Sequence, residues 1–163
     1  MPLFRRRSLP DAVRAVALDP GERRLGWGVT TTGDAVLATS HGLRLPGLPP
    51  LPWADVERAT WRRPSLTVTK VAPVDGTGER WQLDLAEEDE LPDVIRTQVT
   101  DSVAWSNHVM LTPSGGVRLV GRRRPGQELL DWQLVHDIGT DPNDPQVRAQ
   151  GEALVQDARR TIG

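Results

Sequence analysis

The chain has 163 residues, of which 37% are hydrophobic and 26% charged, so its length and composition fit one ordinary soluble domain with a single core. It contains no cysteine, which excludes disulfides and thiolate metal sites. Its net charge of −2 provides no global attraction for nucleic acid or an anionic bilayer. The aromatic residues are six Trp and one Phe, so tryptophans must supply the large side chains of the core.

The first ten residues are basic and bounded by proline, which predicts a mobile arm ahead of a single domain formed by residues 11–163. No apolar stretch of signal-peptide length follows Arg5, Arg6 and Arg7. No window approaches the roughly 18 continuous apolar residues that span a membrane. We therefore expect a cytoplasmic protein.

Residues 21–71 predict an antiparallel meander. Its first strand carries Gly26 and Gly28 on one face, and residues this small indicate that another element packs closely there. Prolines in residues 46–52 lack backbone donors, which favours a loop, and residues 53–61 fit either a strand or a helix. The strands are expected at 25–31, 35–40, 43–45, 66–71 and, beyond the meander, 81–85.

The second half of the chain predicts two helices and a hairpin. Apolar residues recur every four positions from Leu91 to Val103, which predicts a helix over 92–108 that begins after an acidic run. A hairpin is expected from strands at 117–121 and 129–135. Asp144 as N-cap and Pro145 at the first helical position then predict a terminal helix with one apolar face.

Catalytic and metal sites are not expected from the histidines. His41, His108 and His136 lie in separate segments, and none has a second histidine two to four residues away, which is the spacing of metal ligands. No phosphate-binding loop appears. An enzyme would have to assemble scattered groups in one pocket, and the candidates are Asp55, Glu57, His108 and His136.

Charged clusters are the candidate binding residues. Blocks of like charge usually face solvent or a partner, and Arg is among the residue types that anchor interfaces. A basic turn and an acidic run are the expected contacts with a partner, and the basic arm could contact phosphate or a membrane. The residues are Arg122, Arg123 and Arg124 in the turn, Glu87, Glu88 and Glu90 in the run, and Arg5, Arg6 and Arg7 in the arm.

A predicted strand ends at 38–40, a short apolar strand follows at 43–45, and Pro52 and Trp53 open the next strand. In this pattern, residues 38–57 resemble the bacterial pleckstrin-homology-like (PH-like) domains. The resemblance covers about residues 21–71 and extends to the C-terminal helix. It implies a curved sheet closed at one end by a final helix. Its lipid-binding members hold phosphates with basic residues around the first hairpin. No basic residue occurs in the turn at 30–34, so a phosphoinositide site is not expected.

The fold expected is therefore α+β: a curved antiparallel sheet or partly open β-barrel of about seven strands, closed by a C-terminal helix, with an inserted helix near 92–108. The function expected is that of a non-catalytic binding or adaptor module that recognises a protein partner, without cofactor or metal. Peripheral binding to an anionic membrane through the basic arm is one alternative, and an enzyme with a site not recognisable from sequence is another. Nucleic acid is not expected as a partner, and the oligomeric state stays open.

Overall fold

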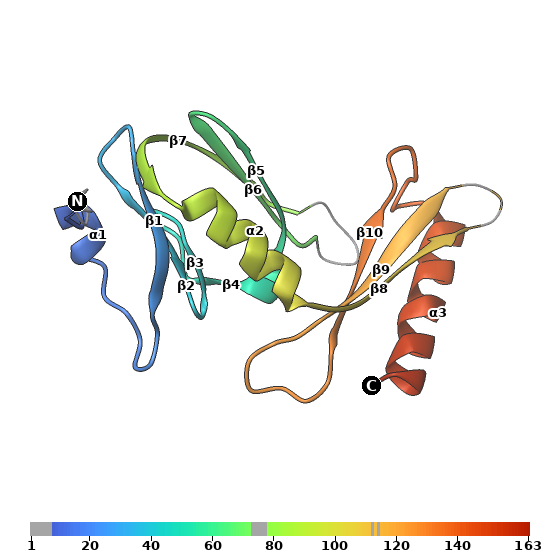
Figure 1. Cartoon of the computed structure of the whole chain (residues 1–163). Coiled ribbons are helices and arrows are strands. Elements are labelled where there is room, and N and C mark those ends of the chain that lie inside the picture. Colours follow the sequence, from blue (N-terminus) through green and yellow to red (C-terminus); the bar gives the residue numbers. More distant parts are fainter. Residues whose placement is uncertain (1–7, 73–77, 112, 114) are drawn as a thin grey trace, which may run out of the picture.

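The computed structural model describes residues 8–72, 78–111, 113 and 115–163, and its strands form two separate sheets (Figure 1). We call residues 8–102 the first lobe and residues 103–163 the second lobe. None of the helices in this described part of the chain combines the length and hydrophobicity that crossing a membrane requires.

The first lobe is built on a seven-stranded sheet in the order β4-β3-β2-β1-β7-β6-β5. All its strand pairs are antiparallel, and pairing of β1 with β7 joins the first strand to the last in sequence. The α+β class and the curved seven-stranded sheet are thus confirmed. The elements are α1 (Asp11–Arg14), β1 (Arg24–Thr30), β2 (Ala35–Thr39), β3 (Gly42–Arg44), β4 (Leu51–Pro52), η1 (Trp53–Asp55), β5 (Val56–Arg62), β6 (Ser65–Lys70), β7 (Arg80–Asp89) and α2 (Leu91–Ser102).

Helix α2 packs against this sheet and supplies Leu91 and Ile95 to its core, where both are fully buried. The glycines of β1 allow the close approach. A Cβ on Gly28 would lie 2.9 Å from Leu91 Cδ2, and one on Gly26 would lie 3.2 Å from Val94 Cγ2. The expectation that another element packs closely on these glycines is confirmed, and that element is α2.

The second lobe is a three-stranded sheet, in the order β10-β9-β8, covered by a helix. Its inner face carries Trp105 and Trp132, whose rings meet edge to face with centroids 5.5 Å apart. Asp144 caps the terminal helix as expected, because its Oδ1 accepts from the Gln146 backbone N–H at 2.8 Å. The elements are β8 (Val103–Met110), β9 (Gly116–Arg122), β10 (Asp131–His136) and α3 (Pro145–Thr161).

Two expectations about the helices are wrong. The helix expected over 92–108 ends at Ser102, and the residues beyond it form β8, because Val and Trp side chains suit a strand that can pair with β9. The terminal helix α3 packs on β9 and β10, whereas the helix that packs on the seven-stranded sheet is α2. Helix α2 follows β7 directly in the chain and covers the seven-stranded sheet with its apolar face. The strands β8, β9 and β10 form a separate sheet, which α3 covers.

Candidate functional site

A buried arginine joins the two lobes. The side chain of Arg122 donates from Nη1 to Ser102 Oγ at 2.6 Å and to the Val99 carbonyl at 3.3 Å, both at the end of α2. Its Nε donates to Gln133 Oε1 at 2.8 Å, and Gln133 in turn donates to the Ala54 carbonyl in η1 at 2.7 Å. Burial lowers the pKa of the Arg122 guanidinium. The junction is therefore held by a hydrogen-bonded network rather than by apolar packing alone.

Arg124 makes the second link between the lobes. Its Nη2 forms ion pairs with Asp55 of η1 and, at 2.7 Å, with Asp131 of β10. The hydrogen bonds to these two carboxylates raise the pKa of Arg124. The two acidic partners come from different lobes, so the Arg124 guanidinium links the lobes across the junction.

The basic turn was expected to contact a partner, but two of its three arginines instead make hydrogen bonds or ion pairs within the chain. Arg122 is 4% exposed, so it cannot form part of a docking surface in this structure, and Arg124 is held by its two carboxylates. Arg123 is exposed, although its Nη1 donates to the Asp101 carbonyl at 3.4 Å. The run of three arginines therefore leaves Arg123 as its exposed member.

The acidic run lies directly before a helix, as expected, but most of it belongs to a strand. Glu87 and Glu88 belong to β7, where they pair with β1, and Glu90 is the residue before α2, with a left-handed φ of 53°. Glu87 and Glu90 are exposed, while Glu88 forms an ion pair with Arg63 at 3.7 Å. Among the described residues, no ion pair joins this run to the arginine turn. The basic arm with Arg5, Arg6 and Arg7 lies outside the described residues.

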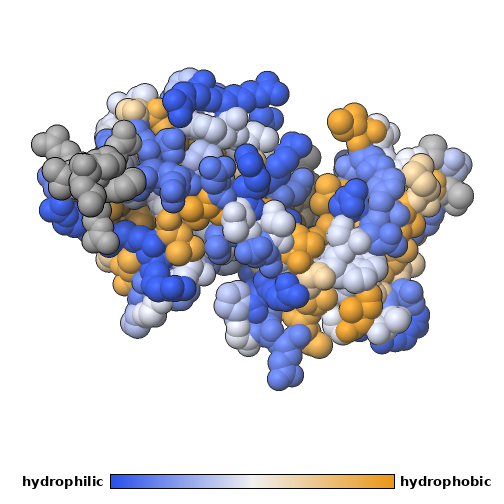
Figure 2. Space-filling model, in the orientation of Figure 1, coloured by the Kyte–Doolittle hydropathy of each residue, from blue (hydrophilic) through white to orange (hydrophobic). Residues whose placement is uncertain are grey.

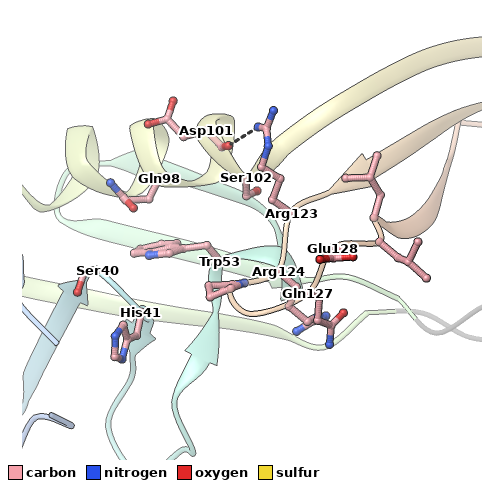
Figure 3. Close-up of a pocket in the computed structure, with 13 residues that line it drawn as sticks. Ser40, His41, Trp53, Gln98, Asp101, Ser102, Arg123, Arg124, Gln127 and Glu128 are labelled. Carbon is pink, nitrogen blue, oxygen red and sulfur yellow. Dashed lines mark hydrogen bonds between the residues drawn. The ribbon is translucent and has the colours of Figure 1, made fainter. Parts of the chain in front are cut away.

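A cavity of about 520 Å³ opens at the junction of the lobes (Figure 3). Four segments build it: the turn between β2 and β3, the start of η1, the C-terminal half of α2, and the loop between β9 and β10. Figure 2 shows hydrophobic residues at the surface beside this junction. The lining is apolar at Trp53, Pro125, Leu129 and Leu130, and polar at Ser40, His41, Gln98, Asp101, Ser102, Arg123, Arg124, Gln127 and Glu128.

Trp53 is the fixed wall of this cavity. Its indole N–H donates to the Thr39 carbonyl at 2.9 Å, so the ring is held in place. In Figure 3 the ring lies between Gln98 and Asp101 of α2 on one side and His41 on the other. Leu129, by contrast, is 68% exposed. The cavity is thus lined by a buried indole that is held in place, an exposed leucine, and a rim with both donors and acceptors.

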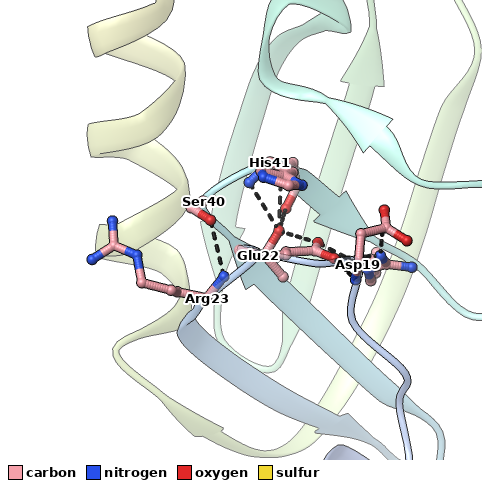
Figure 4. Close-up of polar contacts among 8 residues, drawn as sticks. Asp19, Glu22, Arg23, Ser40 and His41 are labelled. Carbon is pink, nitrogen blue, oxygen red and sulfur yellow. Dashed lines mark hydrogen bonds and ion pairs between the residues drawn. The ribbon is translucent and has the colours of Figure 1, made fainter. Parts of the chain in front are cut away.

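A second polar cluster, at the start of β1, serves the structure (Figure 4). Asp19, Glu22 and His41 lie close enough together to hold a metal ion. However, the Glu22 carboxylate accepts from Arg44 Nη2 at 2.6 Å and Nε at 3.1 Å, and from Thr39 Oγ1 at 2.6 Å. The hydrogen bonds from Arg44 lower the pKa of Glu22 to about 2. A cation bound to these oxygens would be repelled by the Arg44 guanidinium. The cluster is therefore an ion pair that attaches the loop before β1 to β3.

Three of the candidate catalytic groups, Asp55, His108 and His136, do not lie together. Asp55 is paired with Arg124, and His108 contacts Asp137 through Nε2 at 2.6 Å. His108 pairs with Arg118 and His136 pairs with Val117, the preceding residue of β9, so the two histidines lie on opposite faces of the second sheet. Burial lowers the pKa of His136. Among the described residues these groups share no pocket.

The chain was compared with models of protein families, with curated proteins and with solved structures, and none of them matches it. The sequence did not reveal this cavity, since its four segments lie far apart between residues 40 and 130 and meet only in the fold. The one signal that pointed to it was Trp53, which the resemblance to PH-like domains had already singled out.

Proposed function

We propose that the chain is a non-catalytic binding module that holds a short segment of a protein partner in the cavity between its two lobes. The observation that carries this proposal is the cavity of about 520 Å³ with a rigid aromatic wall and a polar rim. Binding pockets typically have volumes of about 300–1,000 Å³, with mainly apolar walls and a few polar groups that set orientation.

The residue types around the cavity suit a peptide segment. Trp and Arg are enriched among the residues that carry most of the energy of an interface, and here Trp53 and Arg123 both line the cavity. One apolar side chain of the partner would pack between Trp53 and Leu129. Its backbone could hydrogen-bond to Gln98 and Glu128 at the rim, because these offer a donor amide and an acceptor carboxylate.

The chemistry of the lining supports binding rather than catalysis. Ser40 and His41 are neighbours in the cavity, yet Ser40 Oγ accepts from the Arg23 backbone N–H at 2.9 Å. Within the described residues no hydrogen bond joins this hydroxyl to the His41 ring. A serine nucleophile needs its base within hydrogen-bond reach and a third group that orients the base.

We also infer that the first lobe is a PH-like domain, with α2 in the role of its closing helix. Two features support this inference. The seven strands form one curved antiparallel sheet from two consecutive meanders, β1–β4 and β5–β7, joined by the pairing of β1 with β7, and a helix comes directly after the last strand. Fold alone assigns no ligand, so the protein-binding proposal depends on the cavity.

Selection from a random peptide library on the immobilised full chain tests the proposal. The affinity of selected peptides is then measured by calorimetry for the wild type, for Leu129→Asp, and for Met110→Asp as a matched control. The control residue is equally exposed, at 69% against 68%, but lies outside the cavity. We expect Leu129→Asp to weaken binding about tenfold or more, and Met110→Asp to leave it unchanged. Equal affinities for the two variants, or a library that yields no binder, would contradict the proposal.

A further inference from the structure

The outer face of β5, β6 and β7 carries three arginines, two from β5 and one from the start of β7. Side chains of a strand alternate between faces, and the exposed positions on β5 include Arg58, Thr60 and Arg62. The register places Arg58 opposite Thr69 and Thr69 opposite Arg80, so one row across the three strands reads Arg, Thr, Arg.

The next two rows complete this surface, which we call the arginine face. Thr60 lies opposite Thr67, which lies opposite Gln82, and Arg62 lies opposite Ser65. A shallow hollow of about 500 Å³ opens over it. The residues that line the hollow are Arg58, Thr60, Arg62, Ser65, Thr67, Arg80 and Gln82.

Within the part of the chain that the structure describes, the three arginines have no acidic partner. Elsewhere in the described residues six arginines pair with carboxylates, but Arg58, Arg62 and Arg80 make no ion pair or side-chain hydrogen bond there. The nearest carboxylate in the register is Asp84, whose Oδ1 accepts from Ser65. The face is therefore a local excess of positive charge on a protein whose net charge is −2. Such an excess attracts anions and lowers its own repulsion by binding them.

The spacing of the charges requires an extended ligand. Arg58 and Arg62 are four residues apart on one strand, about 14 Å at the rise of an antiparallel strand, and Arg58 and Arg80 are two strands apart, about 10 Å. A single small anion cannot contact all three. An extended acidic peptide that runs along β5 has the same rise per residue, so carboxylates four residues apart match Arg58 and Arg62.

The composition of the face selects between classes of polyanion. Binding of single-stranded nucleic acid uses aromatic platforms for its bases, and the neighbouring Trp61 and Trp81 pack against the core on the inner side. Stable attachment to a bilayer uses apolar side chains that insert, and the lining of the hollow contains none. Arginine pairs well with carboxylates, and the threonines and Gln82 can hydrogen-bond to a peptide backbone.

We propose that the arginine face binds an acidic, extended segment of a protein, at a surface distinct from the cavity between the lobes. The two surfaces share no residue, so Leu129→Asp, which blocks the cavity, should leave binding at the arginine face unchanged. Failure at one surface is thus distinguishable from failure at the other.

The test measures binding of a labelled oligo-glutamate peptide to the full chain at low salt. The test variant is Arg58→Ala/Arg62→Ala/Arg80→Ala. The control variant, Arg23→Ala/Arg148→Ala/Arg159→Ala, removes three exposed arginines elsewhere and changes the net charge equally. All proteins keep the basic arm, so its attraction for anions cancels in the comparison.

We expect the test variant to bind about tenfold more weakly or worse, the control to change less than about twofold, and raised salt to weaken the wild type. Both sets of residues are exposed, so both variants should melt like the wild type, and Arg80→Ala alone serves if the triple variant does not fold. Equal loss in the two triple variants, or no binding of oligo-glutamate, would overturn the proposal. So would tighter binding of oligothymidine or of phosphatidylserine vesicles that the same three substitutions abolish.

Discussion

The two lobes bury their residues in different ways. Among the largest fully buried side chains of the described residues, Val117 is the only one that belongs to the second lobe. The first lobe encloses its core between a curved sheet and α2, whereas the second lobe has three strands with a helix on one face. The face of this sheet away from α3 is covered in part by the hydrogen-bonded junction at Arg122 and Gln133.

This difference indicates an unequal dependence. The second lobe relies on the first to cover Arg122 and Gln133, while the core of the first lobe lies within its own sheet and α2. Because α2 takes part in both the core and the junction, damage to that helix should reach both lobes. Damage at the junction should reach the second lobe most.

The largest effect is expected from Leu91→Ala in the core of the first lobe. Leu91 is fully buried, so its truncation should lower the free energy of unfolding by about 2–5 kcal/mol. Urea unfolding followed by tryptophan fluorescence measures it. Leu129→Ala removes the same atoms from a side chain that is 68% exposed, and should cost less than about 0.5 kcal/mol. Equal costs for the two leucines would show that α2 is not part of the core.

A smaller and more local effect is expected from Arg122→Met. This change keeps the bulk of the side chain but leaves Gln133 Oε1 and the Val99 carbonyl without their donor, at a cost of about 1–3 kcal/mol. Hydrogen exchange should show the loss of protection mainly in β8 to β10. Arg123→Met, on the exposed neighbour, is the control and should change little. Equal loss of protection throughout β1 to β7 would contradict the unequal dependence of the lobes.

The smallest effect is a pH dependence that belongs to the first lobe. Arg44 holds the pKa of Glu22 at about 2 in the folded protein, below its ordinary value of 4.5. A lowered folded-state pKa contributes stability that is complete above about pH 5 and is lost as the pH falls towards 2. The advantage of the wild type over Glu22→Gln should therefore shrink over this range, by on the order of 1–2 kcal/mol.

Unfolding curves at a series of pH values measure the Glu22 effect. The exposed Glu152, on α3, is the matched control, and Glu152→Gln should show no such pH dependence relative to the wild type. Parallel curves for the wild type and Glu22→Gln would show that the Glu22–Arg44 pair adds no net stability to the first lobe.

Much of the local structure could be predicted because its signals lie within a few residues. The turn glycines and the alternation of side chains located most strands of residues 21–71. Gly26 and Gly28 indicated that another element packs closely on β1. Asp144 and Pro145 marked the start of α3. The end of α2 at Ser102 could not be predicted, since the Val and Thr residues around it suit a helix or a strand. Pairing with β9 decided between them.

The fate of the arginines shows where such prediction stops. The contiguous run of Arg122 and its neighbours looked like a surface patch, but Arg122 is buried and Arg124 pairs with Asp55, which is 69 residues away. The arginine face, by contrast, could not be recognised as a cluster in the sequence, because Arg58 and Arg80 become neighbours only through the pairing of β6 with β5 and β7.

The sequence by itself therefore determined the turns, caps, strand periodicity and small-residue faces of this protein, since each depends on the geometry of adjacent residues. Only the tertiary structure decided which helix covers which sheet, which charges are buried or exposed, and where the cavity opens. These properties depend on partners far away in the chain, and the stabilisation of a buried charge or a shared apolar face exists only once those partners meet.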